Sequence, residues 1–351
     1  MNFEPTPEQL RLLDLASAFA TEGGALPATD AESFPAKASA GLGGCGLFST
    51  RPALDAALVT MTLARASAAL GAAFASGWLF LDALRRYGDT TLGSVAASVE
   101  AGVRIAAVVL PSRKENTEGG IVASGAAGAL TLAGISAPAA FVPVASDALV
   151  VARLENGDDL LACVELSAKG VSKGRPLPSL GLEGAPRGAL ELRGVQVATE
   201  QVLARGYEAG LTLGALYGTR SILSAAVAVG VAGRALDRTL SHVRARGKVA
   251  QSTEFVVSDL STAYDAARLA TAQAAFRRDA GDDAGEGGAT AKLLATRAAT
   301  QICHGALGVC GEAGYDDALR RAYLDARHLE LYDGAEAEQI DDIASRMLGE
   351  S

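Results

Sequence analysis

The chain has 351 residues, enough for two or three packed layers or domains around a sizeable core. Its net charge of −9 argues against a nucleic-acid-binding protein, because such a chain has no basic surface to compensate phosphate charge. The N-terminal segment lacks the basic-then-apolar order of a secretion signal, and no apolar run is read as a membrane span, so we expect a cytoplasmic protein.

Residues 1–102 are predicted to form a helical N-terminal domain. Thr6 supplies an N-cap, Pro7 the first helical position and Gln9 the third residue of a capping box. Leucine, valine and alanine then recur at helical spacing over 56–73 and 75–87. The glycines from Gly41 to Gly46 lack both a GxGxxG order and a preceding strand, and we interpret them as a surface connection.

Residues 103–203 have a different texture, with short alternating apolar segments separated by Gly, Pro and Asn. The segments RIAAVVL, GALTLAG, DALVVARL, DLLACVEL and GALELRGVQV are typical of strands. Their regular spacing over about a hundred residues predicts a central antiparallel β domain, a barrel or a sandwich.

Residues 204–351 return to helical periodicity and are predicted to form a four-helix bundle. The expected helices span 215–246, 253–278, 289–305 and 335–348, and the polar, Gly-rich stretch from Asp279 to Gly288 is expected to be a solvated loop. The four cysteines are unevenly spaced and suggest reduced thiols; with His304 and Glu312 they match no zinc pattern, so we expect no metal.

The most informative segment runs from Leu324 to Gln339 and reads LDARHLELYDGAEAEQ. Asp333 stands before a glycine that is poorly suited to a helix interior, which predicts a turn between two helices. The segment resembles the catalytic loop of the acyl-CoA dehydrogenase family, where R-D-A-R is followed by Y-E-G-T. The spacing matches from Asp325 through Asp333, and three positions depart from the family pattern: Leu324 for Arg, Asp333 for Glu, and Ala335 for Thr.

This resemblance implies a multidomain α+β fold with a helical N-terminal domain, a central β domain and a C-terminal four-helix bundle. It implies FAD as cofactor, an acyl-CoA thioester as substrate, and Asp333 as the base that removes the α-proton, next to Gly334. The aspartate side chain is roughly 1.5 Å shorter than glutamate, a difference large enough to affect the rate. The alternative interpretation is that Asp333 caps the last helix, since aspartate is a preferred N-cap residue.

Other family positions are only partly kept. The resemblance places Arg220, after Thr219, at a conserved arginine of the first bundle helix near the substrate, and no carboxylate precedes it. Arg246 matches the arginine of R-x-x-F-G and can pair with pyrophosphate, although Val249 and Ala250 replace the aromatic residue and the glycine. The alternative for Arg246 is a solvated basic cluster that ends a helix.

The flavin-ring contacts are the most altered. Val108-Val109-Leu110-Pro111 stands where the family has L-T-E-P, and Ala140-Phe141-Val142 where it has a W-I-T-like segment, so hydroxyls are lost unless Ser112 or Ser136 replaces them. The run from His304 to Gly308 resembles H-G-G-x-G, which in the family packs near the neighbouring subunit's flavin. Gln301, Gly305 and Gly308 are the candidate cofactor contacts there, and the alternative is that His304 is an ordinary core residue.

Three hypotheses follow from the resemblance. The first is an FAD-dependent acyl-CoA dehydrogenase that forms an α,β-unsaturated thioester and passes electrons to an electron-transfer flavoprotein, as a homodimer or homotetramer. The second is a non-catalytic or half-site subunit of a heteromeric acyl-CoA dehydrogenase, of the kind that acts on bulky lipid or steroid thioesters. The third is another flavin oxidase or monooxygenase on the same fold, which the Y-D-G sequence disfavours. The acyl group is not given by the sequence.

Overall fold

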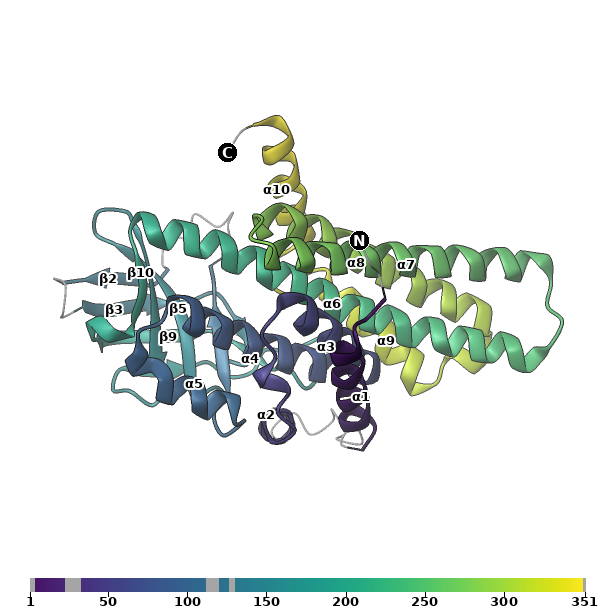
Figure 1. Ribbon diagram of the computed structural model, residues 1–351, viewed down its shortest axis with the longest axis horizontal. Coiled ribbons are helices and arrows are strands. Elements are labelled where there is room, and N and C mark those ends of the chain that lie inside the picture. The colour runs from purple at the N-terminus through teal and green to yellow at the C-terminus, as the bar shows by residue number, and fades with distance from the viewer. Residues whose placement is uncertain (1–3, 23–32, 112–119, 126–129, 350–351) are drawn as a thin grey trace.

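The structure is a computed structural model that describes residues 4–22, 33–111, 120–125 and 130–349. Helices at both ends of the chain flank a central β-sheet, and the long helices of the C-terminal part run side by side away from the sheet (Figure 1). The fold class expected from the sequence is confirmed. The proposed domain boundary at 102/103 falls between α5 and β1, whereas the one at 203/204 falls within β10, so the exact division remains a proposal.

The N-terminal region is helical, and the capping box predicted at its start is present. The Thr6 amide donates to Gln9 Oε1 at 2.9 Å, and the Gln9 amide donates to Thr6 Oγ1 at 3.2 Å. The helices are α1 (Pro7–Glu22), α2 (Phe34–Gly44), α3 (Ala53–Ala66), α4 (Ala68–Tyr87) and α5 (Gly93–Glu100), with short 3₁₀ turns at Leu47–Ser49 and Thr90–Leu92.

Two details of this region differ from the prediction. Residues 41–44 belong to α2 rather than to a surface connection. Gly43 packs against the backbone of Ala101 and Gly102, where a side chain would collide, and this contact explains the glycine at that position. The single helix expected over 56–73 is broken at Ser67, whose extended backbone ends α3 and whose hydroxyl caps α4 by accepting from the Leu70 amide.

The central sheet is mainly antiparallel, with two parallel pairings that the sequence did not predict. Its order is β10-β6-β5-β2-β3-β9-β7; β1 and β2 both pair with β5 in parallel, and β4 pairs with β8 separately. The strands are β1 (Ala106–Val109), β2 (Val122–Ser124), β3 (Leu130–Ile135), β4 (Ala139–Ala140), β5 (Asp147–Leu154), β6 (Asp159–Glu165), β7 (Val171–Lys173), β8 (Arg187–Gly188), β9 (Leu190–Val197) and β10 (Val202–Arg205), with a 3₁₀ turn at Thr199–Gln201.

The C-terminal region contains the four predicted helices, but the fourth, at 335–348, packs mainly on one neighbour, α8, and projects from the molecule, so its place in the bundle was predicted wrongly (Figure 1). An additional helix, α9, which packs on α6 and α8, precedes the Asp333 turn. The elements of this region are α6 (Tyr207–Arg246), α7 (Gln251–Asp279), α8 (Ala284–Cys310), a 3₁₀ turn (Gly311–Gly314), α9 (Asp317–Leu329) and α10 (Glu336–Leu348). The expected loop over 279–288 is much shorter. Asp283 accepts a hydrogen bond from the Gly285 amide and caps α8, so the helix already begins at Ala284.

Helix α6 forms the centre of the molecule. It packs against α3, α4, α7, α8 and α9, and most of its middle is buried. By length and composition it could pass for a membrane span, contrary to the expectation from sequence, but 89% of its most apolar window is buried inside the protein. Its apolar character is thus explained by its position in the core. Trp78 of α4, fully buried, donates its indole N–H to the Thr50 carbonyl at 2.9 Å.

Candidate functional site

Asp333 lies in the turn between α9 and α10, as the sequence predicted. Its backbone is left-handed, with φ of +55°, and Gly334 follows at φ of +108°, a conformation that favours glycine. The Asp333 carboxylate is half-buried, and its Oδ2 accepts a hydrogen bond from Ser224 Oγ of α6 at 3.1 Å. The N-cap of α10 is Ala335, with no side-chain cap, so Asp333 does not occupy the capping position of the alternative interpretation.

Lys292 of α8 holds this turn from inside the protein, a contact that the sequence analysis missed. Its side chain is 1% exposed, and Nζ donates to the carbonyl oxygens of Tyr332, Asp333 and Gly334 at 2.7, 2.9 and 2.7 Å. Burial lowers the pKa of Lys292 to about 7, and Arg220 adds to that effect, while Asp333 opposes it. A lysine directly flanked by Ala291 and Leu293 in a predicted helix was the available sequence signal.

A small cavity lies beside the Asp333 carboxylate, and we call it the Asp333 pocket. Its volume is about 20 Å³, enough for about one water molecule, whereas sites for drug-sized ligands measure about 300–1,000 Å³. Four parts of the fold meet around it: α4, the β domain, α6 and the Asp333 turn. The lining residues are Ala75, Ser76, Leu79, Val108, Ala140, Arg220, Leu223, Ser224, Val227, Tyr332 and Asp333.

Arg220 lines the Asp333 pocket, so the structure brings together the predicted base and the predicted substrate-side arginine. The guanidinium carbon of Arg220 stacks over the Tyr217 ring at 5.0 Å, and its Nε is buried without a hydrogen-bond partner in the described part of the chain. Tyr217 in turn donates its hydroxyl to the Pro111 carbonyl at 2.7 Å, which fastens α6 to the end of the β1 segment. Thr219 donates to the Ala215 carbonyl at 2.8 Å and is not part of the lining.

Among the described residues, the β-domain side of the Asp333 pocket offers no hydroxyl group. Val109 is 3% exposed and packs in the core of the sheet, and the β-domain side chains that reach the pocket, Val108 and Ala140, are apolar. Ser136 is engaged elsewhere, since its Oγ accepts from the Leu190 amide at 2.9 Å and donates to the Ala137 carbonyl at 2.7 Å. Ser112 lies outside the described residues. The described β-domain side chains beside this pocket therefore offer a flavin ring no hydroxyl donor.

Arg246 lies far from the Asp333 pocket. Arg246 is the last residue of α6 and is 26 residues beyond Arg220, a distance of about 39 Å along the helix. It is exposed and lies near Cys310, at the C-terminal end of α8. The sequence analysis assigned Arg220 to the substrate and Arg246 to the cofactor, and in one chain they lie far apart along α6.

Gln301, His304 and Gly308 follow one another at helical spacing on the exposed side of α8, and with Arg246 we call them the outer end. A Cβ at Gly308 would meet nothing within 4 Å, so this stretch of helix is open to a ligand or another chain. Gly305 differs, because a Cβ there would lie 2.7 Å from the Leu260 side chain of α7. Gly305 therefore allows α8 to pack closely against α7. His304 is exposed, which does not match the core interpretation.

No metal site is evident among the described residues, which contain no group of three or more His, Cys, Asp or Glu side chains placed to hold an ion. Burial raises the pKa of Cys163 and of Cys303 to about 12, so neither thiol is a ready nucleophile.

Comparisons with known proteins agree with this geometry. Residues 210–348 match the acyl-CoA dehydrogenase C-terminal domain family. The chain is 30% identical over 193 residues to a 3-(aryl)acrylate reductase of Clostridium sporogenes, covering 53% of this chain and 51% of that protein. It is 29% identical over 180 residues to a cyclohex-1-ene-1-carbonyl-CoA dehydrogenase of Geobacter metallireducens, covering 49% of this chain and 47% of that protein. These matches span about half the length of the curated relatives.

The fold match extends over the whole chain. Butyryl-CoA dehydrogenase from Megasphaera elsdenii superposes with a TM-score of 0.89 at 19% identity, covering 99% of this chain and 100% of that one. At that identity the likeness concerns the fold, while the domain match and the curated relatives concern the family. The C-terminal part of the chain, residues 210–348, thus resembles the acyl-CoA dehydrogenase family, and the whole chain shares the fold of butyryl-CoA dehydrogenase.

Proposed function

We propose that this chain is a subunit of a heteromeric acyl-CoA dehydrogenase, and that a second chain supplies the complete FAD site and carries the oxidation of an acyl-CoA thioester to its α,β-unsaturated product. The observation that carries the proposal is the volume of the Asp333 pocket, about 20 Å³. Leu79, Leu223 and Val227 are among the side chains that close it. An acyl chain and a flavin ring need far more space.

The outer end supports a role beside the flavin of another chain. Arg246, Gln301 and His304 are exposed and carry groups that can donate hydrogen bonds to phosphate oxygens. Arg246 lies about 39 Å along α6 from Arg220, which lines the Asp333 pocket, so we infer that one chain cannot place Arg246 and Asp333 on the same FAD. Two chains side by side can.

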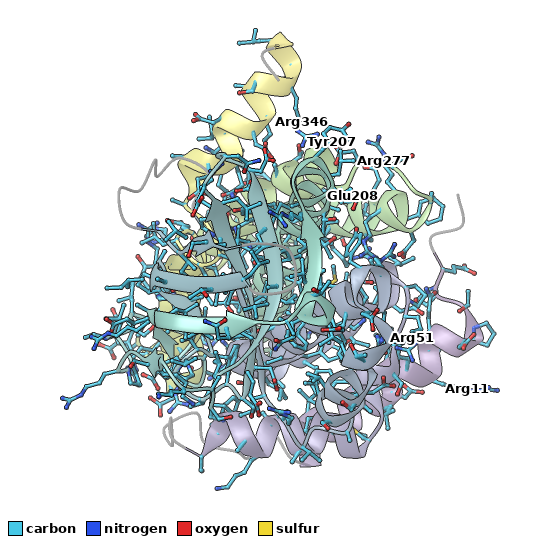
Figure 2. All side chains as sticks on the ribbon, turned by 90° about the vertical axis from the view of Figure 1, so that its left-hand side faces the viewer. Arg11, Arg51, Tyr207, Glu208, Arg277 and Arg346 are labelled. Carbon is cyan, nitrogen blue, oxygen red and sulfur yellow. The ribbon has the colours of Figure 1, made fainter. Side chains whose placement is uncertain are left out.

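Exposed apolar side chains provide the surface for such a partner. Helix α10 projects from the rest of the molecule (Figure 1), and its Met347 and Leu348 are 82% and 71% exposed. Figure 2 shows Arg346 of α10 above the first turn of α6, where Tyr207 points outward and is 83% exposed. Large apolar residues this exposed are typical of protein interfaces. A cytoplasmic assembly that passes its electrons to an electron-transfer flavoprotein completes the proposal.

A second candidate is a self-sufficient acyl-CoA dehydrogenase with Asp333 as its base. The observation in its favour is the Asp333 carboxylate, which faces the pocket together with Arg220 and Ser224. In this case Asp333 accepts the α-proton of the thioester, and Ser224 orients the carboxylate through their hydrogen bond. The flavin supplies the redox chemistry when it is bound. The pocket must then widen by movement of its apolar lining.

The decisive test is expression of the chain alone and together with candidate partner chains encoded beside it. We expect the chain alone to be colourless, and the co-purified complex to contain FAD that is bleached by an acyl-CoA. Stoichiometric FAD in the isolated chain, bleached by an acyl-CoA, would overturn the subunit proposal and favour the second candidate.

The role of Asp333 is tested in the active complex by Asp333→Asn, with Asp341→Asn of α10, which is exposed, as the matched control. The subunit proposal expects both variants to retain the wild-type rate of flavin bleaching. If Asp333 is the base, its variant alone loses roughly 10²–10⁴-fold in that rate, the usual contribution of a general base.

A further inference from the structure

The turn that carries Asp333 contains carbonyl groups that its own backbone leaves unpaired. Helix α9 ends at Leu329 and α10 begins at Glu336, and between them the chain takes two successive left-handed residues. In the described structure, the backbone hydrogen bonds of this turn use the carbonyls of His328, Glu330 and Ala335 and not those of residues 332–334. Three neighbouring carbonyl oxygens therefore need a donor from elsewhere.

Lys292 supplies all of these hydrogen bonds from one atom. A protonated lysine has three N–H donors, and the three carbonyls lie 2.7–2.9 Å from its Nζ. No carboxylate lies within ion-pair distance of this ammonium group among the described residues. Because burying a cation without a counter-ion is costly, the carbonyl oxygens must provide most of its stabilisation.

The charged groups around Lys292 come from four parts of the fold. Arg220 of α6 and Arg187 of β8 disfavour the ammonium, while Asp333 of the turn and Glu338 of α10 favour it. With burial, these effects lower the pKa of Lys292 to about 7, and the three accepting carbonyls act in the opposite direction by stabilising the charged form. Loss of the proton removes one of the three donors and turns a lone pair towards a carbonyl oxygen.

We propose that Lys292 is a positioning residue for Asp333: its ammonium group draws the carbonyls of residues 332–334 together and so fixes the turn that presents the Asp333 carboxylate to the pocket. Deprotonation of Lys292 loosens the turn and frees the carboxylate from its place beside Ser224. This inference goes beyond the proposed function, since it concerns the turn whether Asp333 acts as a base or only borders a partner's site.

The test is hydrogen–deuterium exchange of the full chain, followed in the peptide that covers residues 330–339. In Lys292→Met we expect at least about tenfold loss of amide protection in this peptide, the equivalent of one or more hydrogen bonds. Thr296→Val is the matched control. It lies one turn further along α8, is 2% exposed, and loses only the hydroxyl that donates to the Lys292 carbonyl. Unchanged protection in Lys292→Met, or an equal loss in both variants, would overturn the proposal.

A pH profile separates positioning from simple core packing and needs no variant to fold. In the wild-type chain, protection of residues 330–339, corrected for intrinsic exchange, should fall as the pH rises from about 6 to about 10, the range in which a buried lysine loses its proton. Protection in the central strands should stay constant. If protection of the 330–339 peptide does not change with pH, the proposal that deprotonation of Lys292 loosens the turn is wrong. Neither measurement uses flavin or activity, so failure of the subunit proposal leaves both tests valid.

Discussion

The Asp333 pocket and the outer end of the bundle are built in opposite ways. Around Asp333 the polar groups are enclosed and bonded to one another, as in the contacts of Ser224 and Lys292. At the outer end Arg246, Gln301 and His304 face solvent. Buried polar side chains that bond to one another fix a conformation, whereas exposed polar side chains are available to bind a ligand or a partner. The proposed subunit role rests on this difference between an enclosed and an exposed group of polar side chains.

The largest expected effect is a loss of stability on removal of a buried ion pair, compared with removal of an exposed arginine at the outer end. Arg278 of α7 forms an ion pair with Asp82 of α4, both side chains are 8% exposed, and the guanidinium lies 5.6 Å from the centre of the Trp78 ring. Arg278→Met leaves Asp82 buried with only Arg86 as an ion partner among the described pairs, and we expect a loss of about 3–5 kcal/mol in the free energy of unfolding in urea. Arg246→Met should change it by less than about 0.5 kcal/mol. Equal losses would erase the contrast.

The second prediction concerns the open side. If Arg246 pairs with the pyrophosphate of a partner-held FAD, Arg246→Ala weakens FAD retention by the complex by about 10–100-fold, the equivalent of a hydrogen bond to a charged group. The neighbouring Arg244→Ala, also exposed in the last turn of α6, is the control and should retain FAD as the wild type does. Dialysis followed by flavin fluorescence measures the loss. Identical retention in both variants would remove Arg246 from the site.

The third prediction compares two histidines, His328 near the Asp333 turn and His304 at the outer end. His328 of α9 is half-buried beside Tyr332, and burial lowers its pKa below the usual value. Because the unfolded chain binds this proton more readily, stability is lost as the pH falls below about 6.5, with a slope of at most about 1.4 kcal/mol per pH unit. Urea titrations at several pH values should show His328→Leu flattening this slope. His304→Leu, which alters an exposed residue, should leave the slope as it is.

The smallest effect concerns the inner side of α8. Cys303 is fully buried next to the exposed His304, and burial raises its pKa to about 12, about a thousandfold less thiolate than at an ordinary value of 9.0. With a disulfide reagent, we expect Cys45, which is half-buried, to react first, and Cys303 only on unfolding. If Cys45 is the first thiol to react, the Cys45→Ser variant lacks the fast phase of the labelling reaction. Rapid labelling of Cys303 in the native chain would show that α8 is not packed as described.

Local sequence signals predicted much of the fold because they act over a few residues. The Thr6–Gln9 capping box and the bundle helices required only spacing and composition. The start of α8 was misplaced because glycine and aspartate are frequent in loops, and only the Asp283 cap shows that the helix begins before Gly285. The parallel pairing of β1 with β5 also escaped prediction, since strand partners are distant in the sequence.

By itself, the sequence determined the family resemblance, the turn at Asp333-Gly334 and the loss of hydroxyls at Val109 and Val142. These are properties of residue type and spacing, which a chain displays before it folds. Only the tertiary structure decided that Lys292 holds the turn, that Arg220 lines the same pocket as Asp333, and that this pocket is small. Those facts depend on packing between residues far apart in the chain, and packing leaves no periodic trace in the sequence.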